Sequence, residues 1–409
     1  MGNINRKRSD LISKKVTKIP IKGKKGKKYV YRYKYVKRHG KRKRIRVKVP
    51  VKRYKTTVTT SVKHFDTYST SNSPRFMEGA RYWLQWAGVP DSVYSRTKGQ
   101  DDYSDDFQSR GFWVNYLSGG STSNPGSTGL NIPLDMALAL HTDAGMTSDS
   151  VIGTLAIHTV RNSQGGVVYK NGVSRWIGRE LTDKVQTQVV NDIHQLYDNT
   201  WPRRHLWNRS YSESRVPEVP TVLLELLSHQ NFADMRYGLD PRFRFDASRS
   251  IYKGVLRYLA DQNNFDYVVQ PLPIEAFSAQ FGDSSSVNLK WLPVEDPIEK
   301  TASPTGYIVY TCVDGGGFDN GEYVINNKFT RKIEKNKIYG FKVEAVNDGG
   351  KSFPSEILSV CKTNNDTTVL IINGFNRISA PATFDDGITA GFNTRSEERR
   401  VGKECRSRW

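Results

Sequence analysis

The spacing of apolar residues in the main body of the chain changes near residue 271. Upstream, apolar residues recur at helical spacing in some segments and in short, near-continuous runs in others. Helices are therefore predicted at 74–88, 174–197 and 244–260, and buried strands at 132–141, 151–158 and 217–225. Strands that alternate with helices in this way indicate an α/β layered domain with a mainly parallel sheet, in which the first two strands are neighbours.

Two other stretches differ from this pattern. The polar segment 89–129 is rich in Gly, Ser and Asp and predicts mainly loop, with a solvated acidic loop at 101–106. From residue 271 onward, short runs with a period of two predict an all-β sandwich, with strands at 287–292, 306–311, 338–346 and 357–361. A further strand at 367–374 is expected to open another domain, 367–394, that the sequence holds only in part.

Near the N-terminus, basic and apolar residues alternate on both sides of Gly40. The alternation covers 29–37 and 44–54, and its period of two predicts a hairpin that turns at 38–41. A solvated linker is the other interpretation. We favour the linker, because an isolated two-stranded hairpin is only marginally stable in water.

The positive charge of the chain is confined to this same segment. The whole chain carries a formal charge of +21, from 62 Lys and Arg against 41 Asp and Glu. Residues 1–64 hold 25 of the bases and a single acid, Asp10, so they carry +24 and the remaining 345 residues carry −3. A basic globular nucleic-acid domain is excluded, because its bases would spread over a folded surface. A basic arm, 1–64, on a near-neutral body remains.

Two polar residues stand where buried strands are expected to end, His141 and Glu225. Sites in open α/β sheets form at the carboxyl ends of strands, where a histidine and a glutamate suit a metal ligand and a general base. Each residue alone has a simpler interpretation. A lone histidine is often a satisfied core residue, and a glutamate after a strand often begins a helix, favoured by the helix dipole.

A resemblance favours the chemical interpretation. Segment 139–145, Ala-Leu-His-Thr-Asp-Ala-Gly, resembles the S-[IL]-H-A-N-A motif of zinc-dependent N-acetylmuramoyl-L-alanine amidases. Segment 220–231, Pro-Thr-Val-Leu-Leu-Glu-Leu-Leu-Ser-His-Gln-Asn, resembles their P-A-V-L-[VI]-E-x-x-F-[LI]-S-N motif. The resemblance covers about 75–262 in order, and it implies that 65–262 is the C-terminal part of a three-layer α/β amidase domain, here incomplete.

The resemblance assigns roles to the two residues. It implies that His141 is a ligand of Zn²⁺ and that Glu225 is the catalytic carboxylate, which activates the zinc-bound water. The family's other two ligands are a histidine in a His-Gly-Gly-like loop and a glutamate on the first helix. No His-Gly-Gly occurs in the sequence, and the helix that carries Glu78 matches a later helix of the family, so Glu78 is not assigned. Both ligands are therefore expected upstream of Met1. We therefore expect a hydrolase in the parent protein and no amidase activity in this chain alone.

The wider organisation resembles envelope proteins of Bacteroidetes-type bacteria, in which a golvesin-like β domain interrupts the amidase. Such proteins are also described as xanthan-lyase-like, although no lyase residue set is apparent. The resemblance implies a secreted or cell-envelope parent whose partner is peptidoglycan or another anionic envelope glycan, with no specific nucleic-acid partner. The sequence contains neither a signal peptide nor an apolar run long enough to span a membrane.

The two C-terminal parts also carry resemblances. Residues 266–364 resemble a fibronectin type III domain, which implies that Trp291 is the core tryptophan and Tyr339 the tyrosine of the tyrosine corner. Residues 395–409 resemble the translation of a common sequencing adapter, so we exclude them from function.

Two alternatives to the enzyme stay open. The first is an adhesion or binding protein, in which the basic arm and the fibronectin domain hold an envelope polysaccharide beside a degenerate enzyme domain. The second is nucleic-acid binding through residues 1–64, where tyrosines alternate with bases, a pattern that suits single strands.

Overall fold

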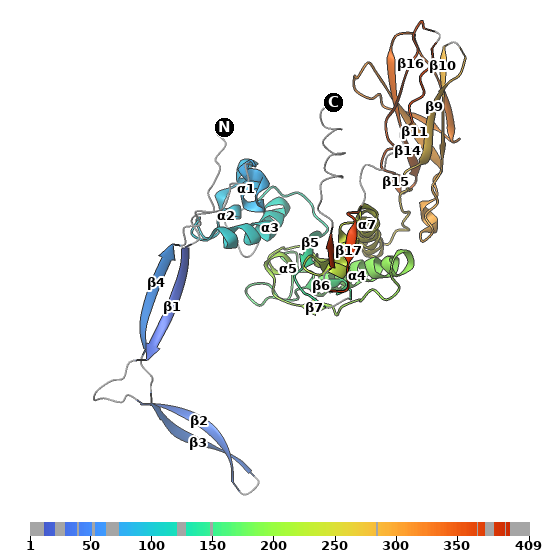
Figure 1. Cartoon of the computed structure of the whole chain (residues 1–409). Coiled ribbons are helices and arrows are strands. Elements are labelled where there is room, and N and C mark those ends of the chain that lie inside the picture. The colour runs from blue at the N-terminus through green and yellow to red at the C-terminus, as the bar shows by residue number, and fades with distance from the viewer. Residues whose placement is uncertain are drawn as a thin grey trace. The chain divides into compact units, whose positions relative to one another are not determined.

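The computed structural model describes the chain except for residues 1–11, 21–28, 39–40, 51–53, 63–72, 121–127, 148–149, 284, 366, 373–379, 389 and 393–409. Two compact units make up the chain, residues 1–106 and 107–409 (Figure 1). The adapter-like segment 395–409 lies outside the described residues. Among the described residues, no helix is both long and apolar enough to cross a bilayer.

Two antiparallel strand pairs form the basic part of the first unit. β2 (Tyr29–Arg38) pairs with β3 (Lys41–Pro50), and β1 (Ile12–Pro20) pairs with β4 (Tyr54–Val62) (Figure 1). The predicted hairpin is therefore present, and the linker interpretation that we favoured is wrong. The β1–β4 pair was not predicted, because β1 and β4 carry few apolar residues in alternation.

Short helices follow in the first unit. The predicted helix 74–88 is divided into a 3₁₀ turn, η2 (Arg75–Met77), and α1 (Ala80–Trp86). Where loop was predicted, the chain forms α2 (Asp91–Tyr94) and α3 (Asp102–Ser118), and α3 continues into the second unit. The expected acidic loop is wrong because its carboxylates begin α3.

The start of α3 explains this difference. The Asp101 carboxylate accepts a hydrogen bond from the Ser104 backbone N–H at 3.0 Å, as a helix N-cap does. Asp105 is fully buried, and its carboxylate accepts the Gly99 backbone N–H at 3.1 Å. Acidic residues are also favoured in the first helical turn by the helix dipole.

The second unit contains a four-stranded sheet in the order β5-β8-β6-β7. β5 and β8 are parallel, and so are β6 and β7, but β6 is antiparallel to β8. The sheet is therefore mixed, with two of its three strand pairings parallel as predicted and one antiparallel pairing that was not predicted. β6 is also separated from β5 by β8, whereas we predicted that the two were neighbours. The described residues between β5 and β6, 144–147 and 150–154, form no helix, and a parallel return needs a crossover of about a dozen residues or more, usually helical. The strands are β5 (Ala137–Asp143), β6 (Leu155–His158), β7 (Trp207–Asn208) and β8 (Thr221–Ser228).

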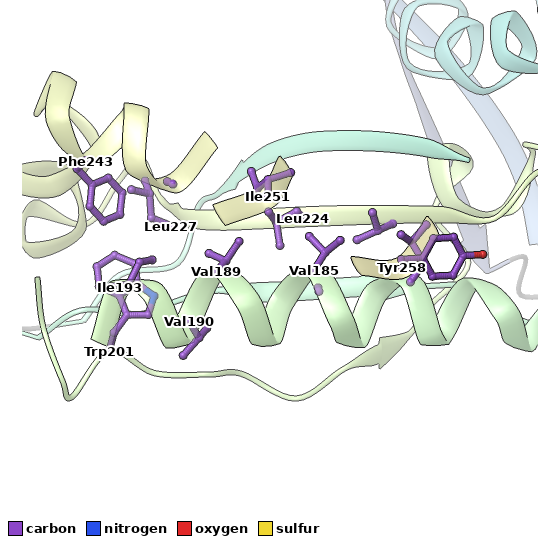
Figure 2. Packing of buried hydrophobic residues seen from close by; sticks show 14 residues of the cluster. Val185, Val189, Val190, Ile193, Trp201, Leu224, Leu227, Phe243, Ile251 and Tyr258 are labelled. Atoms are coloured by element: carbon purple, nitrogen blue, oxygen red, sulfur yellow. The ribbon is translucent and has the colours of Figure 1, made fainter. Parts of the chain in front are cut away.

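Helices cover one face of this sheet. α4 and α7 confirm the two long helices predicted from apolar spacing, and they pack against each other. Val185 and Val189 of α4 meet Leu224 of β8 and Ile251 of α7 in a buried cluster (Figure 2). The helices of the unit after α3 are α4 (Trp176–Leu196), α5 (Ser212–Arg215), α6 (Phe232–Gly238) and α7 (Pro241–Asn263).

Residues 275–361 form the predicted all-β sandwich. One sheet has the order β13-β10-β9 and the other the order β12-β11-β14-β15, with β16 also paired to β14. The strands are β9 (Glu275–Phe281), β10 (Ser286–Leu292), β11 (Gly306–Val313), β12 (Glu322–Val324), β13 (Lys328–Lys332), β14 (Ile338–Asn347), β15 (Gly350–Lys351) and β16 (Leu358–Cys361).

Both residues singled out in this domain occupy their expected places. Trp291 is 1% exposed, and its ring contacts Phe277 and Tyr307 edge-on in the core. The Tyr339 hydroxyl accepts a hydrogen bond from the Glu334 backbone N–H at 3.2 Å, which is the tyrosine-corner arrangement.

The strand predicted at 367–374 is wrong for its described part. Residues 367–372 form neither helix nor strand, and their four consecutive apolar side chains, Val369 to Ile372, are exposed. Beyond them, β17 (Thr383–Asp385) and β18 (Ala390–Phe392) form a short antiparallel pair. The ring of Phe392 lies 5.1 Å from that of Phe232.

Candidate active site

His141 and Glu225 lie side by side on neighbouring strands. They are register partners on the parallel strands β5 and β8. Paired residues of adjacent strands share a face of the sheet, so both side chains stand on the face opposite to the α4–α7 layer, to which Leu224 belongs. The predicted convergence is present, but both residues lie within their strands and not at the strand ends.

A carboxylate that was not predicted from the sequence lies next to His141. Glu213, on the short helix α5, has its Oε2 2.9 Å from Nε2 of His141. The guanidinium of Arg110, on α3, binds the other carboxylate oxygen of Glu213 at 3.1 Å. A polar four-residue helix carries no periodic signal, so only the tertiary structure brings Glu213 to His141.

Hydrogen bonding shifts the pKa values of His141 and Glu213 in opposite directions. The hydrogen bond to Glu213 raises the pKa of His141 above its ordinary value of 6.5, although burial acts against it. Burial acts to raise the pKa of Glu213, but its hydrogen bonds with His141 and Arg110 prevail and leave that pKa below its ordinary value. Both shifts favour the charged form of the group concerned, the imidazolium of His141 and the carboxylate of Glu213.

Glu225 has a different environment. Burial raises its pKa above the ordinary value of 4.5, opposed by the positive charges of His141 and Arg204. Its Oε2 is buried and has no hydrogen-bond partner among the described residues. A half-buried carboxyl group with a raised pKa is suited to proton transfer near neutral pH.

A second ion pair fixes the end of β5 next to this site. Asp143 Oδ2 lies 2.6 Å from Nη1 of Arg204, and the Arg204 guanidinium also lies over the ring of Trp207. Burial acts to raise the pKa of Asp143, but the hydrogen bond from Arg204 lowers it overall. On β8, the Ser228 hydroxyl donates to the backbone oxygen of Asp143 at 3.1 Å and so ties the two strands together.

The donor set fits one zinc ligand and not a whole zinc site. A zinc-bound histidine usually donates its other ring N–H to a carboxylate, and Glu213 on Nε2 is such a carboxylate, which leaves Nδ1 for a metal. A catalytic zinc needs three protein ligands. Within the described ranges, however, no group of three or more His, Cys, Asp or Glu side chains is placed to hold a metal ion.

Comparisons with known proteins bear on the sandwich only. No family model and no curated protein sequence matches the chain. Solved structures similar to part of it include the fourth FNIII domain of a human protein, at 20% identity and a TM-score of 0.21, covering 24% of this chain and 85% of that one. The FN5 domain of Drosophila Lar is 18% identical, with a TM-score of 0.19, and covers 23% of this chain and 99% of that one.

A third similar structure is titin kinase with its flanking domains, at 25% identity and a TM-score of 0.21. It covers 23% of this chain, and this chain spans only 18% of its length. These neighbours are consistent with a fibronectin type III module, although at such TM-scores the assignment depends on the strand order and core of the sandwich itself. They give no support to the amidase or golvesin resemblance.

Proposed function

We propose that the α/β region is part of a zinc-dependent N-acetylmuramoyl-L-alanine amidase, in which His141 is a zinc ligand and Glu225 the general base. The observation that carries the proposal is the register pairing of the two residues on adjacent parallel strands. It supports a joint role because a ligand and a general base must reach the same water molecule.

The residues of the chain have separate tasks in this proposal. Zinc, when bound, polarises the amide carbonyl and acidifies a water molecule. Glu225 accepts the proton of that water and delivers it to the leaving amine, and the raised pKa of its carboxyl group brings it closer to the working pH. Glu213 holds the His141 ring through Nε2, and Arg110 holds Glu213 in turn.

The proposal also covers the substrate and the location of the parent protein. Its substrate is peptidoglycan or a related anionic envelope glycan, and its place is outside the cell or in the envelope. Since the described residues supply a single ligand, the chain by itself is expected to bind zinc weakly and to leave the muramoyl amide uncut.

Zinc titration of the full chain tests the assignment. We expect weak binding at one site that His141→Ala removes and that His205→Ala, a control at an exposed histidine, leaves unchanged. Glu225→Gln should also retain the binding, because Glu225 is not a ligand. Tight binding of one zinc per chain would show that the ligand set is complete. Unchanged binding in His141→Ala would remove His141 from it.

A second candidate is the binding protein with a degenerate enzyme domain. The observation that favours it is the His141–Glu213 pair, which already satisfies one ring nitrogen without any metal. The strands of the basic arm, β1 to β4, would then supply the positive charge that attracts an anionic polymer.

Salt-dependent binding separates the possibilities. Anionic glycan and single-stranded nucleic acid are compared on the full chain and on a chain without residues 1–64. A selective, salt-resistant affinity for the glycan would favour the binding protein. If both polymers bind alike and the truncation abolishes both, the attraction is non-specific charge.

A further inference from the structure

An exposed tryptophan lies beside the candidate active site with two arginines around it. Trp207, on the edge strand β7, is 36% exposed. The guanidinium carbons of Arg204 and Arg209 each lie 5.7 Å from the centre of its ring. The indole is therefore accessible to a ligand in a position flanked by two positive charges.

The two arginines differ in how firmly they are held. Arg204 is half-buried and ion-paired to Asp143 at 2.6 Å, so its charge is compensated. Arg209 is exposed, and its guanidinium has no hydrogen bond or ion pair to any residue in the described parts of the chain. The backbone of Arg209 is fixed, since its N–H donates to the His158 carbonyl oxygen at 3.0 Å. Arg209 therefore has an uncompensated positive charge, and its backbone is held in place by a hydrogen bond.

Arg204 connects this pair to the catalytic face. It contacts Asp143, two residues beyond His141 on β5, and its backbone N–H donates to the Thr154 carbonyl oxygen at 3.0 Å, just before β6. Its positive charge is also close enough to Glu225 to lower the pKa of that carboxyl group. A molecule that rests on Trp207 is thus next to the surface that holds His141 and Glu225.

We propose that Trp207 and Arg209 form a subsite for a pyranose ring that carries a carboxylate. The face of an indole is a rigid apolar surface that suits the C–H face of a sugar, and a guanidinium binds a carboxylate through two charge-assisted hydrogen bonds. Arg209 is free to leave the indole face and bind the carboxylate while the sugar ring takes its place. Arg204 stays paired with Asp143 and keeps its place over the indole.

The ligand class rests on the proposed function in one respect: hydrolysis of the muramoyl amide sets free the lactyl carboxylate that Arg209 would bind, so the subsite would hold the sugar product. The binding itself needs neither zinc nor hydrolysis. Failure of the subsite and failure of the enzyme assignment are therefore separable.

N-acetylmuramic acid and N-acetylglucosamine make a matched pair of probes, because they differ by a lactyl carboxylate. The full chain is titrated with each sugar while the indole N–H signals are followed by NMR. We expect N-acetylmuramic acid to shift the Trp207 signal and to bind roughly tenfold more tightly than N-acetylglucosamine at low salt, as one charge-assisted contact would give. High salt should reduce this preference.

Variants assign the two parts of the subsite. Arg209→Gln should abolish the preference for the acidic sugar while leaving the weak neutral binding, and Trp207→Ala should abolish both. Trp207→Phe is expected to restore part of the binding and so controls for misfolding. Trp176→Ala removes an even more exposed tryptophan, 57% exposed on α4, and should change neither titration.

Equal affinities for the two sugars, or unchanged binding in Trp207→Ala, would overturn the subsite. His141→Ala and Glu225→Gln should leave the sugar titrations unchanged. If the sugars bind as expected but zinc binding does not depend on His141, the subsite is supported and the enzyme assignment fails.

Discussion

The sandwich and the α/β sheet differ in how the faces of their sheets are covered. In the sandwich, each sheet covers the other, and the core is closed around Trp291, Phe341 and Val343. In the α/β sheet, the helical layer covers β8 but stops short of the edge strand β5. Leu138 and Leu140 of β5 are 41% and 57% exposed, although Val222 and Leu224, their register partners on β8, are fully buried.

The two regions also differ in where chemistry is possible. The closed sandwich has an apolar interior. In the α/β sheet, the face opposite to the α4–α7 layer holds His141, which is partly exposed, next to the half-buried carboxyl group of Glu225. Full burial would remove these groups from solvent, and full exposure would leave their pKa values near the ordinary range. Partial burial on this face therefore marks the candidate active site.

The largest expected effects come from the two buried tryptophans. Trp201→Ala removes a side chain that is 1% exposed in the α/β core, and Trp291→Ala does the same in the sandwich. Each should cost about 3–5 kcal/mol of unfolding free energy in its own region, through lost contacts and a cavity. Denaturant unfolding followed by region-specific amide signals measures this. If either change destabilised both regions equally, they would form one cooperative unit.

Two register partners test the uneven cover of the sheet directly. Leu224→Ala, on β8, should cost about 2–5 kcal/mol, because Leu224 is fully buried. Leu140→Ala, beside it on β5, should cost no more than about 0.5 kcal/mol, as is usual at exposed positions. Urea unfolding of the two variants compares them. Similar losses would mean that β5 is covered in solution by something that binds its apolar face.

Acid should weaken the α/β region more than the sandwich. His158 on β6 is 4% exposed, and burial lowers its pKa from 6.5 to about 4. The folded state thus prefers the neutral ring, so this contribution is complete above pH 6.5 and is lost as the pH falls toward 4. The loss amounts to roughly 3 kcal/mol at most. Unfolding free energies between these pH values measure it, and His158→Leu should remove this part of the slope.

The smallest expected effect concerns the His141–Glu213 pair. Glu213→Gln should bring the pKa of His141, measured by NMR, back toward 6.5, because the hydrogen bond that raises it becomes neutral. Since the folded pKa is raised, the stabilisation by this pair is complete below pH 6.5 and is lost as the pH rises through the raised value. An unchanged pKa of His141 would place Glu213 outside its environment.

The spacing of apolar residues along the sequence predicted the helices and strands that have a clear periodic pattern. Apolar spacing located α4 and α7, and the period of two located the sandwich with Trp291 and Tyr339 in their expected places. It missed α3, which begins at the Asp101 cap and at the buried Asp105, whose carboxylate accepts a backbone N–H. It also missed the direction of β6, which is antiparallel to β8.

The candidate site, like the fold, was predicted only in part from the sequence. Short motifs identified His141 and Glu225, but not that they are register partners. Glu213 and Arg110 reach His141 from distant parts of the sequence and share no motif with it. Their role depends on three-dimensional placement, which periodicity does not encode.

The central claim is that His141 and Glu225 form one coupled site, and the pKa of the Glu225 carboxyl group tests it most directly. Carbon-13 NMR of the full chain should give a value above the ordinary 4.5, because burial disfavours the charged carboxylate. In His141→Gln this pKa should rise further, because the nearby positive charge that lowers it is gone. A Glu225 pKa at or below 4.5 that is unchanged in His141→Gln would contradict the account.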